Sequence, residues 1–141
     1  MRITRGIGIA LTGVMMAAGL VTATASSASA AASDCLLQYV PVYNDSGLAG
    51  YALWNADPSS CANGDNLGAE DLSTDGYSVV AHLRKPGASV PDRVVTTSGY
   101  TAPVTVWKGG NLPEGDPYFM WACLSKNGVE SHCTDMFTVI A

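Results

Sequence analysis

The chain has 141 residues, with 12 acidic side chains against seven basic ones and a formal net charge of −5 at pH 7. An acidic surface of this kind repels phosphate groups, which excludes nucleic acids and anionic membrane surfaces as partners. The length fits one small domain with one hydrophobic core.

The first 30 residues predict an export signal that is removed from the mature protein. Two arginines precede an uncharged run, residues 6–21, and the segment ends on the small residues Ala28-Ser29-Ala30 that signal peptidase requires. The run is shorter than the roughly 20 apolar residues that span a membrane. We therefore expect residues 31–141 to form one secreted domain, outside the cell or at its surface, with no membrane contact after cleavage. That domain has five basic and 12 acidic residues, a net charge of −7.

Four cysteines in an exported domain of this size predict two disulfides. They are Cys35, Cys61, Cys123 and Cys133. Three pairings are possible, and sequence order favours Cys35 with Cys61 and Cys123 with Cys133. The dipeptide Asn127-Gly128 supports the second pair, because it favours a tight hairpin turn that brings neighbouring strands within disulfide reach.

Runs of β-branched and aromatic residues, separated by turn signals, follow the leader, and no helix-period stretch occurs among them. The first run contains Pro41, which predicts an edge strand or a bulge because proline donates no ladder hydrogen bond. In chain order the runs predict strands at 36–43, 48–55, 77–84, 93–97, 102–107, 118–125 and 134–140. About seven short strands in this length favour a two-sheet sandwich of broadly immunoglobulin-like architecture, with a small closed barrel as the alternative.

The strand at 77–84 alternates in a way that assigns its two faces. Its odd-numbered residues share the predicted inner face, and its even-numbered residues, His82 among them, face outward to solvent. The predicted core consists of these inner residues and of matching positions in later strands: Tyr77, Val79, Ala81, Leu83, Val104, Val106, Met120 and Ala122.

One long segment, 56–76, has no strand pattern and carries five acidic residues. Loops of this length are usually functional or loosely ordered. Calcium prefers several oxygen ligands from a flexible segment, but Asn63-Gly64-Asp65-Asn66 lacks the alternating acidic order of a calcium loop. We therefore expect a solvated acidic loop, with a calcium site in it as the alternative.

The sequence predicts no catalytic, cofactor-binding or metal-binding residues. The two histidines, His82 and His132, are expected on the surface, and neither stands in a nucleophile motif. A metal site at His132, Cys133 and Asp135 is disfavoured because Cys133 is expected to be bonded to sulfur, and the sequence has no zinc-site spacing.

The aromatic residues and two loops leave further roles open. Trp54, Trp107 and Trp121 lie within predicted strands or at their ends, which favours packing in the core, at its rim or against a disulfide, with stacking on sugar rings as the alternative. The stretches 85–91 and 109–113 are candidate protease-inhibitor loops, although turn chemistry alone accounts for them.

The stretch 77–106 and a later cysteine carry a resemblance. A strand ending in Leu83-Arg84, a glycine turn, Asp92, the run Tyr100 to Val106 and Ala122-Cys123-Leu124 are similar to the spore-associated protein A type of small secreted protein from filamentous actinobacteria. The likeness covers roughly a third of the chain. It implies export and association with the spore or hyphal surface, and it brings no catalytic residues with it.

These observations predict a secreted, non-enzymatic protein that is surface-associated or an interaction protein of the spore-associated kind. Its expected partners are components of the cell or spore surface or another extracellular protein, and no cofactor is expected. Two other functions stay open: an inhibitor of an extracellular protease or glycosidase, and a carbohydrate-binding module. An exposed apolar or aromatic patch on one sheet would distinguish a binding protein from a merely stable shell.

Overall fold

The computed structural model describes residues 37–57 and 64–141, which belong to one compact unit. The predicted signal segment and the predicted pair Cys35–Cys61 lie outside the described residues. In the part of the chain that is described, no helix is long and apolar enough to cross a membrane.

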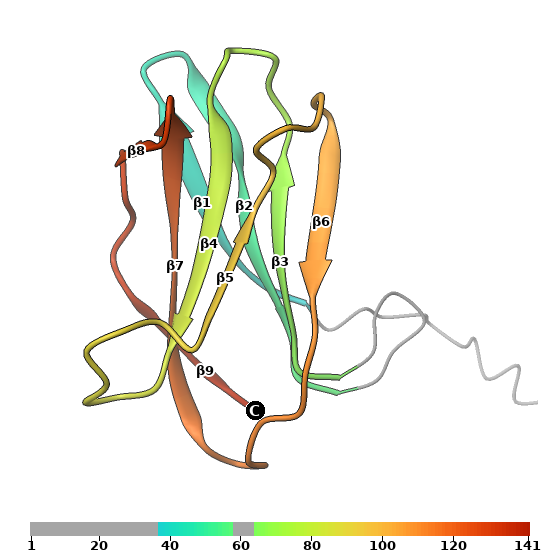
Figure 1. The fold of residues 1–141 in the computed structure, drawn as a ribbon, viewed down its shortest axis with the longest axis vertical. Coiled ribbons are helices and arrows are strands. Elements are labelled where there is room, and N and C mark those ends of the chain that lie inside the picture. The colour runs from blue at the N-terminus through green and yellow to red at the C-terminus, as the bar shows by residue number, and fades with distance from the viewer. Residues whose placement is uncertain (1–36, 58–63) are drawn as a thin grey trace, which may run out of the picture. The chain divides into compact units, whose positions relative to one another are not determined.

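The fold is all-β, with two antiparallel sheets (Figure 1). The first sheet has four strands, in the order β1 (Gln38–Asn44), β2 (Gly47–Asn55), β3 (Asn66–Asp71) and β6 (Val104–Lys108). The second sheet has the order β5 (Arg93–Thr96), β4 (Ser78–Arg84), β7 (Pro117–Lys126) and β8 (Val129–Ser131), and β9 (Phe137–Ile140) also pairs with β7. The predicted two-sheet sandwich is confirmed, whereas the alternative of a closed barrel is wrong because the two sheets remain separate.

The described residues form nine strands, where the sequence predicts about seven. The unpredicted strand β3 lies inside the segment 56–76 and consists mostly of residue types that strands disfavour. It forms because β2 and β6 hydrogen-bond to it on both sides, and all six of its residues are buried or half-buried. The second unpredicted strand, β8, has three residues and returns along β7 after the Asn127-Gly128 turn.

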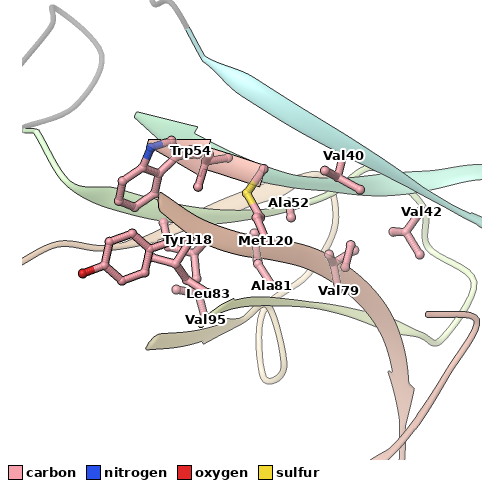
Figure 2. Packing of buried hydrophobic residues seen from close by; sticks show 14 of the residues in the cluster. Val40, Val42, Ala52, Trp54, Val79, Ala81, Leu83, Val95, Tyr118 and Met120 are labelled. Carbon is pink, nitrogen blue, oxygen red and sulfur yellow. The ribbon is translucent and has the colours of Figure 1, made fainter. Parts of the chain in front are cut away.

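The core lies between the sheets and takes side chains from both, as Figure 2 shows for Ala52 and Trp54 of one sheet and Ala81 and Met120 of the other. Five residues of the predicted core belong to this buried cluster: Val79, Ala81, Leu83, Met120 and Ala122. Tyr77 and Val106 pack against the cluster but stay partly exposed, and Val104 is half-buried outside it. The predicted inner face of β4 is therefore confirmed.

Trp54 joins the two sheets. Its ring is buried in the core, and its Nε1 donates a hydrogen bond of 2.8 Å to the carbonyl oxygen of Ile140 in β9. This tryptophan has the core-packing role that the sequence favours.

The edge strand β1 behaves as its proline predicts. It lies at the outside of the four-stranded sheet, and its register with β2 shifts between Val42 and Tyr43. An edge strand pairs on one side only, so the N–H group that Pro41 lacks costs the sheet little there.

The outer edge of β7 is covered in two parts. β9 pairs with the first residues of β7 and β8 with its last ones (Figure 1). Between them, the amide of Thr134 donates to the carbonyl oxygen of Ala122 at 2.9 Å, and the amide of Ala122 donates to Thr134 Oγ1 at 3.1 Å. The predicted disulfide Cys123–Cys133 is present beside this contact, with Cα atoms 4.0 Å apart. It ties the segment between β8 and β9 to the middle of the sheet.

Candidate functional site

The middle of the outer face of the five-stranded sheet is partly covered by side chains of the chain itself. His82 of β4 is only 7% exposed there, and it stacks on Trp121 of β7 with ring centroids 4.7 Å apart and planes 5° from parallel. His82 Nε2 lies 3.1 Å from Glu130 Oε2 of β8, and the Arg84 guanidinium lies 5.6 Å from the centroid of the Trp121 ring. The predicted exposure of His82 is therefore wrong. Strand parity gives its face correctly, but side chains from neighbouring strands bury it.

The outer face of the four-stranded sheet is different, because it presents aromatic side chains to solvent. The pairing register places one row of residues side by side across β1, β2, β3 and β6: Tyr39, Leu53, Gly68 and Trp107. The neighbouring row on the same face is Pro41, Tyr51, Glu70 and Thr105. Both rows point outward because the residues that alternate with them, such as Ala52 and Ala69, lie in the core.

Gly68 allows the indole ring of Trp107 to lie on the sheet. A β-carbon at Gly68 would be 2.7 Å from Cζ3 and 2.8 Å from Cε3 of that ring, closer than real atoms approach. The ring thus occupies the space above β3 that a side chain would otherwise fill. Trp107 packs on the outside of the sheet and is half-buried there, so it does not have the core role of Trp54.

A shallow hollow of about 210 Å³ opens on this face over β1, β2 and β3. It is lined by Leu37, Tyr39, Tyr51, Leu53 and Glu70. The rings of Tyr39 and Tyr51 meet edge to face, with centroids 5.6 Å apart and planes at 84°. Tyr39 is 64% exposed, and Glu70 is the one charged residue among the lining residues. We call these five residues together with Trp107 the aromatic face.

The aromatic face has the chemistry of a binding surface. Its rings offer flat apolar areas, its tyrosine hydroxyls donate and accept hydrogen bonds, and Glu70 contributes a carboxylate that accepts them. This face is therefore the candidate functional site.

A serine, a histidine and an aspartate meet elsewhere on the surface. His132 Nδ1 is 3.0 Å from Ser131 Oγ, and His132 Nε2 is 3.8 Å from Asp45 Oδ1. In a hydrolase triad the serine contacts Nε2 and a buried aspartate contacts Nδ1. Here the two nitrogens have the opposite partners, and the Asp45 side chain is fully exposed. The geometry does not match a catalytic triad.

One group of possible metal ligands forms among the described residues: His82, Cys123 and Glu130. Cys123 is bonded to Cys133, so its sulfur is not a thiolate that could coordinate a metal. The same bond removes Cys133 from the combination with His132 and Asp135 that the sequence disfavours. In the disulfide-bonded protein neither group offers three ligands.

The predicted solvated loop at 56–76 is wrong for two of its acidic residues, since Asp65 and Asp71 are buried. Asp65 Oδ2 accepts a hydrogen bond of 2.8 Å from the amide of Leu112. Asp71 accepts hydrogen bonds from the amide of Ser73 at 3.1 Å and from the hydroxyl of Thr97 at 3.2 Å. Burial raises the pKa of Asp71 above its ordinary value of 3.8. These two carboxylates join strands and loops of the sandwich, and residues 58–63 of the segment lie outside the described residues.

Both stretches that the sequence marks as candidate inhibitor loops are held by hydrogen bonds. In 85–91, the amide of Lys85 donates to Asp92 Oδ2 at 2.6 Å, and the amide of Ala88 donates to the carbonyl oxygen of Lys85 at 3.1 Å. In 109–113, the bond from Leu112 to Asp65 fixes the loop against the start of β3. Turn chemistry accounts for the first loop, and a buried aspartate anchors the second.

Sequence reasoning does not single out Tyr39, Tyr51 or Glu70. The alternation of residues 39–43 does place tyrosines on one side of a strand, which is a usable signal. Their place on the same face as Trp107 depends on the register of four strands, and one of these strands, β3, is not predicted.

No family model matches the sequence, and a comparison with curated proteins finds no match. A solved structure of an endonuclease/exonuclease/phosphatase from Beutenbergia cavernae is similar over 74% of this chain, with 25% sequence identity and a TM-score of 0.45. The match covers 26% of that protein's chain, so this chain spans only about a quarter of its length.

Proposed function

We propose that this protein is a secreted, non-catalytic binding domain that attaches to components of the cell or spore surface through its aromatic face. The observation that carries the proposal is the pair of exposed Tyr39 and half-buried Tyr51, whose rings meet at the hollow on the four-stranded sheet. The opposite outer face supplies the contrast, because there Trp121 is already covered by His82 and Arg84. The four-stranded sheet differs in that it combines a mostly exposed ring, Tyr39, with a hollow beside it.

The exposed Tyr39 fits a binding role better than a folding role. A side chain that is 64% exposed, as Tyr39 is, contributes little buried area to the stability of the domain. Aromatic side chains are enriched in binding surfaces because they offer a large, rigid contact area at a low cost in conformational entropy. The aromatic face therefore supports a role in binding.

Three features support an extracellular location. Residues 1–30 have the order of an export signal, the domain that follows is strongly acidic, and the disulfide Cys123–Cys133 suits an oxidising compartment. The resemblance to spore-associated proteins adds the spore or hyphal surface as the expected place of attachment.

The test is depletion of the protein from solution by washed hyphae and spores of a filamentous actinobacterium. The full chain is expressed and its secreted product is compared with the variant Tyr39→Ala/Tyr51→Ala. Tyr100→Ala is the matched control, because Tyr100 is 61% exposed and lines a different hollow beside Asp71 and Tyr77. We expect the wild type and the control to be depleted and the double variant to stay in solution. Equal depletion of all three, or of none, would contradict the proposal.

The non-catalytic part of the proposal has its own test. A screen of ester, peptide and glycoside substrates should show no turnover by the purified protein. If turnover occurs and disappears in His132→Ala, the grouping of Ser131, His132 and Asp45 is catalytic after all and the proposal is wrong on this point.

One observation favours an inhibitor as the second candidate function. The loop 109–113 is exposed at Gly110 and Asn111, yet Asp65 anchors it at Leu112. A loop that is already ordered loses little entropy when it binds a protease. The activity of secreted proteases, assayed with and without the protein, tests this second candidate directly. Inhibition that is lost in Asp65→Ala would support the second candidate, and full residual protease activity would remove it.

A further inference from the structure

We propose further that the ligand of the aromatic face is a neutral polysaccharide, with one sugar ring held in the hollow at Tyr39 and Tyr51 and with its chain crossing the sheet toward Trp107. This inference rests on the proposed function, since it names the ligand class of the same face. Four properties of the face lead to it: the size of the hollow, the arrangement of its rings, its charge and its extension across the strands.

The hollow is too small for a drug-sized ligand. Its volume of about 210 Å³ lies below the roughly 300–1,000 Å³ of pockets that enclose such molecules. A shallow site of this size takes a single ring, and the rest of the ligand lies outside it on the sheet. The occupant is therefore one unit of a longer molecule or a small ring by itself.

The side chains in the hollow match the two kinds of surface on a pyranose ring. Such a ring has apolar faces of C–H groups, which pack on aromatic faces, and a rim of hydroxyl groups. Tyr39 and Tyr51 stand at 84° to each other, so a ring packed on one of them meets the other at its rim. The carboxylate of Glu70 lines the same hollow and accepts hydrogen bonds from hydroxyl groups. One small site thus provides a stacking surface and a strong acceptor.

The charge of the site selects a neutral ligand that carries donors. Glu70 is the one charged residue in the lining, and the domain that follows the export signal has 12 acidic against five basic residues. Anionic polymers such as nucleic acids are repelled by such a surface. A carboxylate covered by a ligand also needs hydrogen-bond donors to replace water. The hydroxyl groups of a neutral sugar supply these donors without adding negative charge.

The face extends beyond the hollow in one direction. Tyr39, Leu53, Gly68 and Trp107 form one row across four neighbouring strands, and strands in a sheet are about 4.8 Å apart. Because the Trp107 ring lies over Gly68 of β3, it extends from β6 toward the strands that carry the hollow. A single sugar fills only the hollow, whereas a chain of sugar rings contacts the hollow and Trp107 together. The affinity should therefore rise with the length of the chain.

The first arm of the test uses native affinity gels cast with soluble polysaccharides of known charge. The neutral probes are hydroxyethyl cellulose, soluble starch and laminarin, and carboxymethyl cellulose is the anionic counterpart of the first. We expect retardation by at least one neutral probe, weakened about tenfold in Tyr39→Ala and less in Tyr39→Phe, which keeps the ring. Tyr100→Ala should migrate like the wild type, and carboxymethyl cellulose should retard none of them. Retardation that Tyr39→Ala leaves unchanged, or that only the anionic probe causes, overturns the inference.

The second arm separates this inference from the proposed function. Washed hyphae and spores are treated with periodate, which cleaves sugar rings that carry free hydroxyl groups on adjacent carbons, or with protease, and then used in the depletion assay. We expect depletion to survive protease and, for a polysaccharide with such adjacent hydroxyl groups, to be lost after periodate. If depletion depends on Tyr39 and Tyr51 but is lost after protease and not after periodate, the ligand is a surface protein: the proposed function stands and the inference fails. If the untreated surfaces deplete nothing, the proposed function fails, and the gels alone decide about polysaccharide.

Discussion

The ring of Trp107 lies over Gly68, with its Cζ3 atom 2.7 Å from the place of a β-carbon on that glycine. Gly68→Ala should therefore force the ring off the sheet. We expect a loss of about 1–3 kcal/mol in the free energy of unfolding, as for an overpacked site, and a changed tryptophan emission spectrum. Urea unfolding followed by tryptophan fluorescence measures the free energy of unfolding and records the emission spectrum of the folded variant.

Trp107→Ala supplies the control for that substitution. In a double-mutant cycle the cost of Gly68→Ala should largely vanish when Trp107 is already absent, because nothing then occupies the space above the glycine. An alanine at position 68 that costs the same in both backgrounds would show that the two residues do not interact.

The two histidines should differ sharply in their effect on stability. His82→Ala removes a buried ring from its stack on Trp121 and leaves Glu130 without its 3.1 Å partner. We expect it to cost about 1–3 kcal/mol. His132 is exposed, so His132→Ala should stay within about 0.5 kcal/mol of the wild type. Equal costs in denaturant unfolding would mean that His82 is not buried as described.

The disulfide should hold the divided edge of β7 together. Cys123→Ala/Cys133→Ala opens a loop closed by a separation of 10 residues, which corresponds to about 3 kcal/mol in the chain-entropy model. Hydrogen exchange gives a local readout: the amide of Thr134, which donates to Ala122, should exchange faster in the variant than the amides that join β4 to β7. Uniform acceleration of both sets would indicate only a global loss of stability.

Asp71 should make the domain less stable as the pH rises. Because burial raises its pKa above 3.8, the folded state keeps the proton at pH values where the unfolded state has lost it. Its contribution to the free energy of unfolding therefore falls as the pH rises from 3.8 through the folded-state pKa. Asp71→Asn lacks this titration, so its stability relative to the wild type should increase between about pH 3 and pH 7. A difference that is constant or decreases over that range would contradict this assignment.

Local patterns predict the parts of the fold that depend on one strand at a time. The alternation in 77–84 gives the inner face of β4, and Asn127-Gly128 gives the hairpin that the disulfide Cys123–Cys133 closes. Pro41 marks an edge strand because its missing donor is a property of the residue itself. Each of these inferences needs no knowledge of the neighbouring strand.

The features that the sequence does not predict are those that depend on adjacent strands of the sheet. β3 has a composition that disfavours strands and forms because β2 and β6 pair with it. His82 is outward-facing yet buried because Trp121 and Glu130 come from other strands. The aromatic face likewise requires Tyr39, Tyr51 and Trp107 to be aligned by a register that includes β3. The alternation of residues within a strand predicts the face on which a side chain lies. Its contacts and its burial follow only from the pairing of that strand with the others.

The central claim, that the aromatic face is the ligand-binding surface, is tested most directly by tyrosine nitration of the unaltered protein, free and bound to washed hyphae. Tyr39 and Tyr100 are 64% and 61% exposed, so we expect the two residues to be nitrated to a similar extent in the free protein. Mass spectrometry of the peptides then compares the two residues. The proposal predicts that binding protects Tyr39 while Tyr100 continues to react. Equal nitration of both residues in the bound protein, or protection of Tyr100 alone, would contradict it.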